Sequence, residues 1–429
     1  MKRTLVALML SLCLLFALFP AGAEGEAFLE CREENAMQVE NLPQEREKAW
    51  EDYRNAALED AGMQEELEER VMRFGDVEMR FYVRTYGEAP EGGYPMYIAM
   101  HGGGSSDTPD LNDEQYGIMK SYYADSLDCG VYVAVRGVRD TYDTHSNPES
   151  YPLYDRLIQM MILTHNVNPN RVYLEGFSAG GDGVYAISPR MADRFAAVNM
   201  SAGHPNSISL MNLKNLPIQL QVGENDSAYD RNKVTAEVGM DLNELAEQEG
   251  GYIHRVLVHA DRDHNFEDYD VEEVAVMADP TAWLQNGDRT TEMVDSYPPD
   301  WMYAYTRDPL PEEVIWELDV RAPERSVTSF YYLRAPYSSD HGIIRASYDR
   351  EENKVFVNAE DVQEFSILLN EEMVDFSQPI HFVVNGMDAF ITVEPDRSVL
   401  EETTRERGDR NFQFEAEVPY TLLLAQALQ

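Results

Sequence analysis

Gly176-Phe177-Ser178-Ala179-Gly180 is the most informative stretch of this chain, because of what lies on either side of it. The preceding residues, Arg171 to Glu175, have an apolar centre and predict a short buried strand. The following residues, Gly180 to Ala186, are mostly small and predict a helix that packs closely on that strand. A G-x-S-x-G motif in this setting forms a sharp turn that holds the serine hydroxyl clear of the sheet edge. We therefore expect Ser178 to be a nucleophile.

A glycine run upstream supplies a second part of the same site. His101-Gly102-Gly103-Gly104 follows an apolar run, Tyr94 to Met100, that predicts a central strand. A tetrahedral oxyanion is stabilised by preorganised N–H donors, and glycines let the backbone approach a substrate closely. A plain surface turn is the alternative, but the position directly after a strand favours the functional interpretation. We expect the backbone N–H groups of Gly103, Gly104 and Ala179 to form the oxyanion hole.

An acid that orients the general base is expected after a later strand. The run from Leu216 to Val222 predicts that strand, and Gly223-Glu224-Asn225-Asp226 follows it. We expect Asp226 to be the acid. Asp230 is the second candidate and Glu224 the third, since most loop carboxylates in so acidic a chain are simply solvated.

The expected general base is His264. It follows a strand predicted at Tyr252 to Val258 and lies downstream of Asp226, as the chain order serine, acid, histidine requires. His259, at the end of that strand, is the main alternative. His101 is expected to shape the oxyanion loop. The other histidines lie within the strand, before the acid or in the C-terminal region: His145, His165, His204, His254, His341 and His381.

Together these motifs resemble the α/β-hydrolase superfamily, and more narrowly secreted bacterial esterases related to poly(3-hydroxybutyrate) depolymerases and feruloyl esterases. The resemblance covers about Gly75 to Trp283. It implies a mostly parallel sheet with helices on both faces, and ester cleavage by a triad of Ser178, Asp226 and His264. Polymer depolymerases usually carry paired disulfide cysteines and a substrate-binding module, neither of which is identified here, so the substrate stays open.

The first 23 residues have the pattern of a secretory signal. Met1-Lys2-Arg3 is basic, an apolar run extends from Leu5 to Phe19, and Pro20-Ala21-Gly22-Ala23 supplies small residues for cleavage. The apolar run is short for a membrane span of about 20 residues. We expect cleavage after Ala23 and a secreted, extracellular protein.

Charge limits the partners of the protein. The formal net charge is −44, from 34 Lys and Arg against 78 Asp and Glu. A surface of this kind repels nucleic acid and anionic membranes. We therefore expect no nucleic acid partner. The expected substrate is a small-molecule or polymer ester, and no membrane span is expected after cleavage of the signal.

Cysteine and histidine spacing gives no sign of a metal or another cofactor. Beyond the predicted signal the chain contains Cys31 and Cys129, so at most one disulfide is available. No C-x-x-C or H-E-x-x-H motif occurs, and we expect no cofactor. One acidic group offers calcium ligands, although a solvated loop is the favoured interpretation: Asp107, Asp110, Asp113 and Glu114.

The chain divides into four predicted segments: a signal peptide at 1–23, an N-terminal helical leader at 24–75, an α/β-hydrolase domain at 76–298 and a C-terminal β-rich domain at 299–429. In the leader, Glu65 to Met72 is expected to form a second helix. In the hydrolase domain, one loop is expected to line the pocket with Arg139, Tyr142 and His145.

Beyond Pro298 helical periodicity gives way to short alternating runs, and Asn385-Gly386 is a strong hairpin signal. We expect an antiparallel β domain. Its aromatic residues at strand spacing are more often core, with a carbohydrate or polymer platform as the alternative: Trp316, Phe330, Tyr331, Tyr332 and Tyr337.

Two classes of function fit this sequence. One is a secreted serine hydrolase that cleaves carboxylic esters, or peptides in the manner of prolyl-oligopeptidase relatives. The other is a surface-binding protein that uses a hydrolase fold as a scaffold, since fold alone does not establish function. The complete set of residue types, in the required order, favours catalysis.

Overall fold

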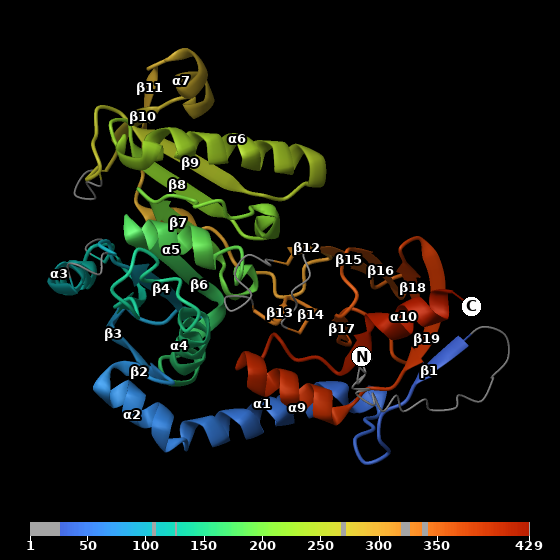
Figure 1. The fold of residues 1–429 in the computed structure, drawn as a ribbon. Helices are drawn as coiled ribbons and strands as arrows, with labels where there is room; N and C mark the ends of the chain where they lie inside the picture. The colour runs from blue at the N-terminus through green and yellow to red at the C-terminus, as the bar shows by residue number, and fades with distance from the viewer. Residues whose placement is uncertain are drawn as a thin grey trace, which may run out of the picture.

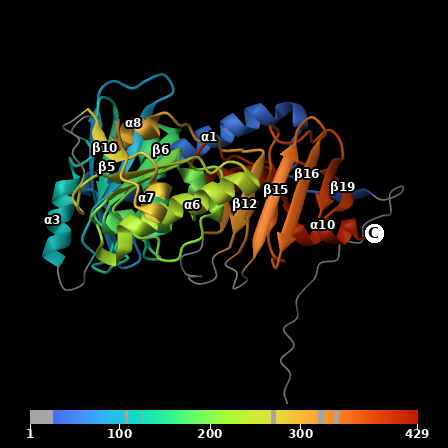
Figure 2. The same cartoon turned by 90° about the horizontal axis from the view of Figure 1, so that it is seen from above.

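A computed structural model describes the protein over residues 26–104, 109–124, 127–266, 272–318, 327–336 and 342–428. The predicted secretory signal lies outside these residues, as do Asp107, Tyr337 and His341. The described residues form two parts that lie side by side, one around a large sheet and one around two smaller sheets (Figures 1 and 2). Among the described helices, none has the length and apolar character needed to cross a bilayer.

The large sheet has the strand order β11-β10-β9-β8-β7-β6-β4-β5-β3-β2. Its centre, from β5 through β4, β6, β7 and β8 to β9, is parallel, and both ends are antiparallel. The strands are β2 (Val71–Phe74), β3 (Val77–Tyr86), β4 (Tyr94–Met100), β5 (Gly130–Val135), β6 (Val167–Phe177), β7 (Ala197–Ser201), β8 (Ile218–Gly223), β9 (His254–His259), β10 (Val274–Met277) and β11 (Thr291–Val294).

Helices cover both faces of this sheet. They are α3 (Pro109–Met119), α4 (Ser150–Thr164), α5 (Ala179–Ile187), α6 (Arg231–Glu249), α7 (Pro280–Asn286) and α8 (Pro298–Tyr303). Helices α4, α5 and α6 pack on one face, where Leu157 and Val184 join a continuous core. Helices α3 and α8 pack on the other, where Tyr116 and Met302 meet Tyr132. Because both faces are covered, β5 is buried at every position. The predicted α/β sheet is confirmed.

The second part contains two sheets. One has six strands in the order β1-β19-β18-β16-β15-β12, and the other has four in the order β13-β14-β17-β20. Most neighbours are antiparallel, while β16–β18 and β1–β19 are parallel. The elements are β12 (Glu313–Glu317), β13 (Ser329–Phe330), β14 (Leu333–Arg334), β15 (Ile343–Asp349), β16 (Lys354–Glu360), β17 (Ser366–Leu369), β18 (Ile380–Val384), β19 (Met387–Val393), α9 (Arg397–Arg407), β20 (Ala416–Pro419) and α10 (Tyr420–Ala427).

The segment predicted as a helical leader also supplies strands to both parts. Strand β1 (Glu26–Leu29) pairs in parallel with β19, and β2 forms the edge of the large sheet. Between them lie α1 (Leu42–Leu58) and α2 (Ala61–Glu69). Helix α2 begins earlier than predicted because the Asp60 side chain accepts the N–H of Met63 at 2.7 Å, which caps the helix.

The aromatic residues considered as a binding platform lie in the core. Trp316, Phe330, Tyr331 and Tyr332 are each at most 3% exposed. Phe330 stacks on Trp316 at a centroid distance of 5.6 Å. Tyr337 is outside the described residues. Strand periodicity places side chains on a face, but it does not say whether that face is covered, and here it is.

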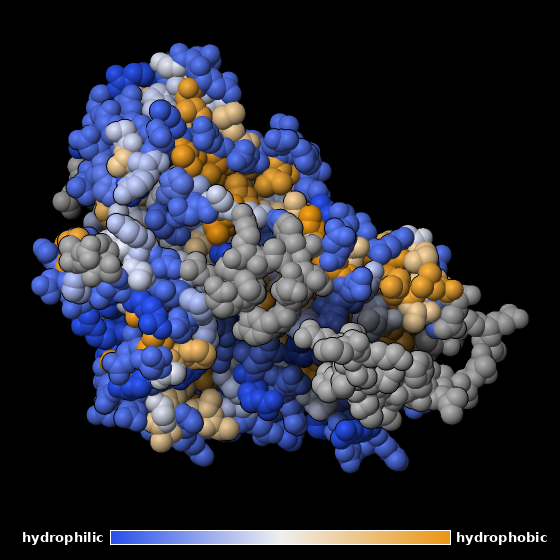
Figure 3. Space-filling view, in the orientation of Figure 1, coloured by the Kyte–Doolittle hydropathy of each residue, from blue (hydrophilic) through white to orange (hydrophobic). Residues whose placement is uncertain are grey.

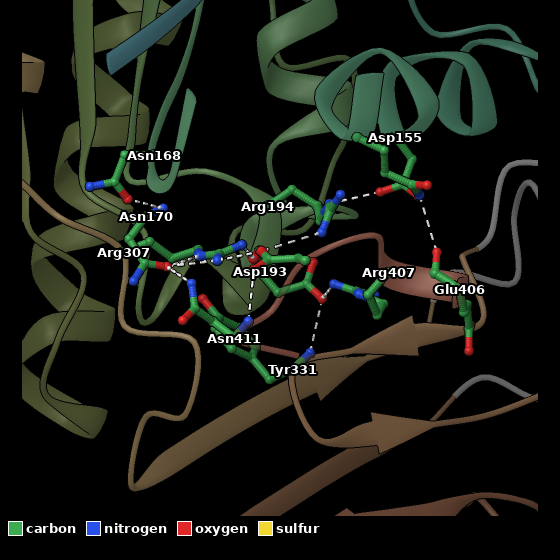
Figure 4. A network of polar contacts seen from close by, with 12 residues as sticks. Asp155, Asn168, Asn170, Asp193, Arg194, Arg307, Tyr331, Glu406, Arg407 and Asn411 are labelled. Atoms are coloured by element: carbon green, nitrogen blue, oxygen red, sulfur yellow. Dashed lines mark hydrogen bonds and ion pairs between the residues drawn. The ribbon is translucent and has the colours of Figure 1, made fainter. Parts of the chain in front are cut away.

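A buried network of charges joins the two parts (Figure 4). Arg307 contacts Asp409 at 2.6 Å, and Asp193 pairs with Arg407 while also accepting the N–H of Tyr331 at 3.0 Å. Arg194 lies 2.7 Å from Asp155 of α4. Because the Asp193–Arg407 pair and the Asp193–Tyr331 hydrogen bond join segments of the two parts, separating the parts would expose charges that are now paired.

Candidate active site

The nucleophile turn has the strained geometry that the motif predicts. Ser178 lies between β6 and α5 with φ 58° and ψ −119°, a conformation that non-glycine residues rarely adopt. Both motif glycines are sterically required. A Cβ on Gly176 would lie 2.3 Å from the carbonyl oxygen of Gly180, and a Cβ on Gly180 would lie 2.1 Å from that of Met100.

The three predicted triad residues lie in one chain of hydrogen bonds. Ser178 Oγ is 3.0 Å from His264 Nε2, and His264 Nδ1 donates to Asp226 Oδ2 at 2.6 Å. The Asp226 side chain is 2% exposed, whereas that of His264 is 34% exposed. The buried carboxylate therefore fixes the tautomer and orientation of a histidine whose other nitrogen is open to the serine.

The loop after β8 holds Asp226 in place. The Asp226 N–H donates to the carbonyl of Gly223 at 3.0 Å, and the Asn232 N–H donates to the Asp226 carbonyl at 3.0 Å. Arg231, the first residue of α6, brings Nη1 to 3.7 Å from Asp226 Oδ1. The acid therefore faces two cationic partners when His264 is protonated. No spacing rule in the sequence signalled Arg231.

The alternative acids are engaged elsewhere. The Asp230 side chain is 66% exposed and pairs with Lys233 at 3.1 Å. Glu224 pairs with Arg289 at 2.6 Å and accepts the N–H of Asp261 at 2.9 Å. Glu224 thus stabilises the turn after β9, which leads to His264, but its carboxylate does not contact the imidazole in the structure.

The alternative base, His259, is a core residue. It is 1% exposed, its Nε2 lies 2.9 Å from Gln221 Oε1, and its ring is 4.5 Å from that of Phe266. Burial lowers the pKa of His259 to about 3. The structure places it away from Ser178 and favours His264.

The predicted oxyanion hole needs one correction. The Gly104 N–H donates to Asn112 Oδ1 at 2.7 Å, so this donor is already occupied. Gly103 and Ala179 make no hydrogen bond through their N–H groups to another described residue. Ala179 is the first residue of α5, where helix N–H groups have no intrahelical partner. Within the described part of the loop, Gly103 and Ala179 therefore keep N–H donors that a substrate oxygen can use.

Two buried histidines support the oxyanion loop. His101 Nε2 accepts the N–H of Gly137 at 3.1 Å, so its Nδ1–H faces the Gly102 carbonyl at 2.5 Å. His145 Nε2 donates to the His101 carbonyl at 2.9 Å. Burial lowers the pKa of His101 to about 4 and that of His145 well below its usual range. Both rings are therefore neutral near pH 7. His101 shapes the loop as predicted.

The three residues expected to line the pocket, Arg139, Tyr142 and His145, do not form one wall of a pocket. His145 is 1% exposed and supports the loop from behind, while Tyr142 is 76% exposed. Arg139 pairs with Glu149. An aromatic wall instead stands beside the serine, where the Phe177 ring lies 5.1 Å from His264 and 5.6 Å from Tyr122. These rings give the site an apolar side.

The charge around the site is mixed. Of the acidic residues considered as calcium ligands in the alternative interpretation, Asp113 pairs with Arg80 and lies 2.8 Å from Arg136 Nε. Among the described residues, no group of three or more His, Cys, Asp or Glu side chains gathers as a metal site. Figure 3 shows hydrophilic residues over most of one face of the molecule, in keeping with the net charge of −44.

Comparison with known proteins gives matches among solved structures only. No family model and no curated protein matches the sequence. Among solved structures, a thermostable esterase aligns with a TM-score of 0.38 and 19% identity over 55% of this chain and 62% of its own. Est1E from Butyrivibrio proteoclasticus aligns at 0.33 and 12% over 46% and 91%. A feruloyl esterase module from Clostridium thermocellum aligns at 0.30 and 14% over 43% and 82%.

This chain therefore covers less than two thirds of the length of the thermostable esterase. The fold itself rests on the strand order, the parallel centre and the turn at Ser178 between β6 and α5. These features define an α/β-hydrolase fold, with a second β-rich part attached to it.

Proposed function

We propose that the protein is a serine hydrolase that cleaves carboxylic esters through a covalent acyl-enzyme. The observation that carries the proposal is the continuous chain from Ser178 Oγ through His264 to Asp226, at 3.0 and 2.6 Å. Such a chain lets the histidine take the serine proton as the oxygen attacks.

Each residue has a defined task in this mechanism. Ser178 Oγ attacks the acyl carbon while its proton moves to His264 Nε2, and the Asp226 carboxylate stabilises the resulting imidazolium. The negative charge on the former carbonyl oxygen is held by the N–H groups of Gly103 and Ala179. His264 then protonates the leaving alcohol. A water molecule, deprotonated by His264, releases the acid and regenerates the serine.

Neutral substrates suit the surroundings of the serine. Phe177 and Tyr122 supply an apolar wall, and the net charge of −44 disfavours polyanions. The buried aromatic residues of the second part do not support carbohydrate binding there.

We also propose that residues 1–23 are a cleavable signal and that the mature protein is secreted. Mass spectrometry of the exported protein tests this, with a mature chain beginning at Glu24 as the expected result.

The decisive experiment compares the mature protein with Ser178→Ala on p-nitrophenyl esters of increasing acyl length. We expect turnover that vanishes in the variant, together with covalent labelling of Ser178 by a fluorophosphonate. Labelling without ester turnover would redirect the assignment to peptides, tested with peptide p-nitroanilides. Absence of both labelling and turnover would favour the non-catalytic binding function, and equal rates in both proteins would exclude Ser178 as the nucleophile.

A further inference from the structure

The occupied N–H of Gly104 points to a residue that the catalytic scheme does not include. Asn112, in the first turns of α3, is 0% exposed and accepts this N–H at 2.7 Å. Asn112 also packs against the Cα of Gly103, since a Cβ on Gly103 would lie 2.3 Å from Asn112 Oδ1. The glycine loop is thus packed directly against this side chain.

A second contact determines which end of the Asn112 amide faces the loop. Asn112 Nδ2 donates to Asp140 Oδ1 at 2.6 Å. A carboxylate only accepts hydrogen bonds, so the amide nitrogen must face Asp140 and the oxygen must face Gly104. Arg136, which is 7% exposed, pairs with the same Asp140 oxygen and holds it in place. Arg136 therefore fixes the position of Asp140, and Asp140 in turn fixes the orientation of the Asn112 amide.

The glycine loop needs such a restraint. Gly103 and Gly104 have φ of +106° and +91°, and neither carries the Cβ that limits rotation in other residues. The peptide that joins them includes the Gly104 N–H, so holding this N–H fixes the plane of the peptide. An oxyanion hole lowers the barrier only when its donors are already aligned before charge develops.

We propose that Asn112 is a positioning residue for the oxyanion hole, oriented by Asp140. By accepting the Gly104 N–H, Asn112 fixes the peptide that follows Gly103, while the His101 Nδ1–H holds the Gly102 carbonyl of the peptide that carries the Gly103 N–H. With the peptides on both sides of Gly103 held, its N–H stays aimed at the developing oxyanion beside the N–H of Ala179. Asn112 itself touches neither the reacting atoms nor the proton that moves. This inference rests on the proposed function and adds a residue that sets its rate.

The effect should appear in the transition state and not in substrate binding. Removal of one oxyanion donor costs about 10²–10³-fold in kcat. Loss of the residue that aligns a donor is a smaller change, and we expect Asn112→Ala to lower kcat about 10–100-fold with KM within about threefold. The rate of phosphonylation of Ser178 and the affinity for a boronic acid inhibitor should fall by the same factor as kcat/KM, because both form tetrahedral adducts.

Matched variants separate this role from a structural one. Asp140→Ala removes the acceptor that orients the Asn112 amide and should reproduce much of the loss, whereas Asp140→Asn retains an acceptor and should restore most of the rate. Asn212→Ala is the control, since Asn212 is 6% exposed and its amide exchanges hydrogen bonds with the backbone of Glu317 in β12 at 3.0 and 2.6 Å. We expect its kcat/KM within about threefold of wild type.

The outcomes distinguish the two proposals. Ser178-dependent turnover with unchanged kcat in Asn112→Ala overturns this inference alone. A rise in KM at constant kcat, or boronic acid affinity that does not follow kcat/KM, also overturns it. A wild-type protein without Ser178-dependent turnover or labelling overturns the proposed function and this inference together.

Discussion

The active-site edge of the large sheet and the junction between the two parts both contain polar groups, but those groups differ in whether the protein supplies their partners. At the junction, Arg307 and Asp409 pair with each other, as do Arg407 and Asp193. At the active site, the Gly103 and Ala179 N–H groups have no partner among the described residues. Charges paired within the protein hold its architecture, whereas donors left open are available to a substrate.

The strongest test of this difference removes the proposed nucleophile. Ser178→Ala should lower kcat by about 10⁴-fold or more, because attack and acyl-enzyme formation are both lost. The same change should leave the thermal midpoint within a few degrees, since Ser178 has no structural partner beyond His264 among the side chains described. Steady-state kinetics and calorimetry on one preparation give both values. A large loss of stability would mean that the serine is part of the framework.

A substitution at the junction should lower stability and leave activity nearly unchanged, the reverse of the result expected for Ser178→Ala. Asp193→Ala removes the partner of Arg407 and an acceptor for the Tyr331 N–H, in a site where Asp193 is 1% exposed. Leaving a buried charge unpaired costs about 3–5 kcal/mol. We expect urea denaturation to show a loss of this size, with kcat/KM of the folded protein nearly unchanged. Loss of activity at full stability would show that the junction takes part in catalysis.

Acid should weaken the framework around the active site through its neutral histidines. The pKa of His101 falls to about 4 and that of His259 to about 3, against an unfolded value near 6.5. A lowered pKa means that the unfolded chain binds protons first, so stability is present above pH 6.5 and is lost as the pH falls. Each histidine should contribute a loss of about 3 kcal/mol by pH 4.

Urea denaturation between pH 7 and pH 4 measures this loss, with His259→Gln as the comparison. The variant cannot titrate at this position and should lose about 3 kcal/mol less than wild type over the same interval. Parallel curves for the two proteins would exclude His259 as a source of the acid sensitivity.

The smallest effect is expected at the second candidate acid. Asp230→Asn should change kcat/KM by less than about twofold, since Asp230 is exposed and contacts Lys233. Asp226→Asn, by contrast, should lower kcat about 10⁴-fold by favouring the wrong histidine tautomer. Kinetics of the two variants side by side check the assignment. Similar losses in both would show that the acid is not Asp226 alone.

The sequence allowed prediction of those parts of the site that depend on local chain geometry, namely the turn at Ser178 and the strand ends that carry Asp226 and His264. A nucleophile turn requires small residues at fixed positions, and Gly176 and Gly180 indeed have no room for a Cβ. Strand ends brought Asp226 and His264 to one edge because neighbouring parallel strands finish together. The same logic overcounted the oxyanion donors, since nothing in the spacing shows that Asn112, from the next helix, accepts the Gly104 N–H.

The second part was less predictable for a different reason. Its strands were recognisable from alternation, but which faces are covered depends on packing. The sequence therefore left a platform open as the alternative for aromatic residues that it favoured as core, and the structure buries Trp316, Phe330, Tyr331 and Tyr332. The parallel pairing of β1 with β19 joins residues near opposite ends of the chain. No local pattern encodes a partner so far away.

That pairing also sets an order of events during synthesis. Strand β1 is synthesised long before its partner β19. Until β19 is made, β1 has no strand to pair with, and Glu45 of α1 lacks Arg397 of α9, which it contacts at 2.9 Å. Strand β2 pairs with β3, and Tyr53 of α1 bonds Gln159 of α4, so these contacts do not depend on β19. A chain truncated before β19 would therefore contain the strands of the large sheet but leave β1 unpaired.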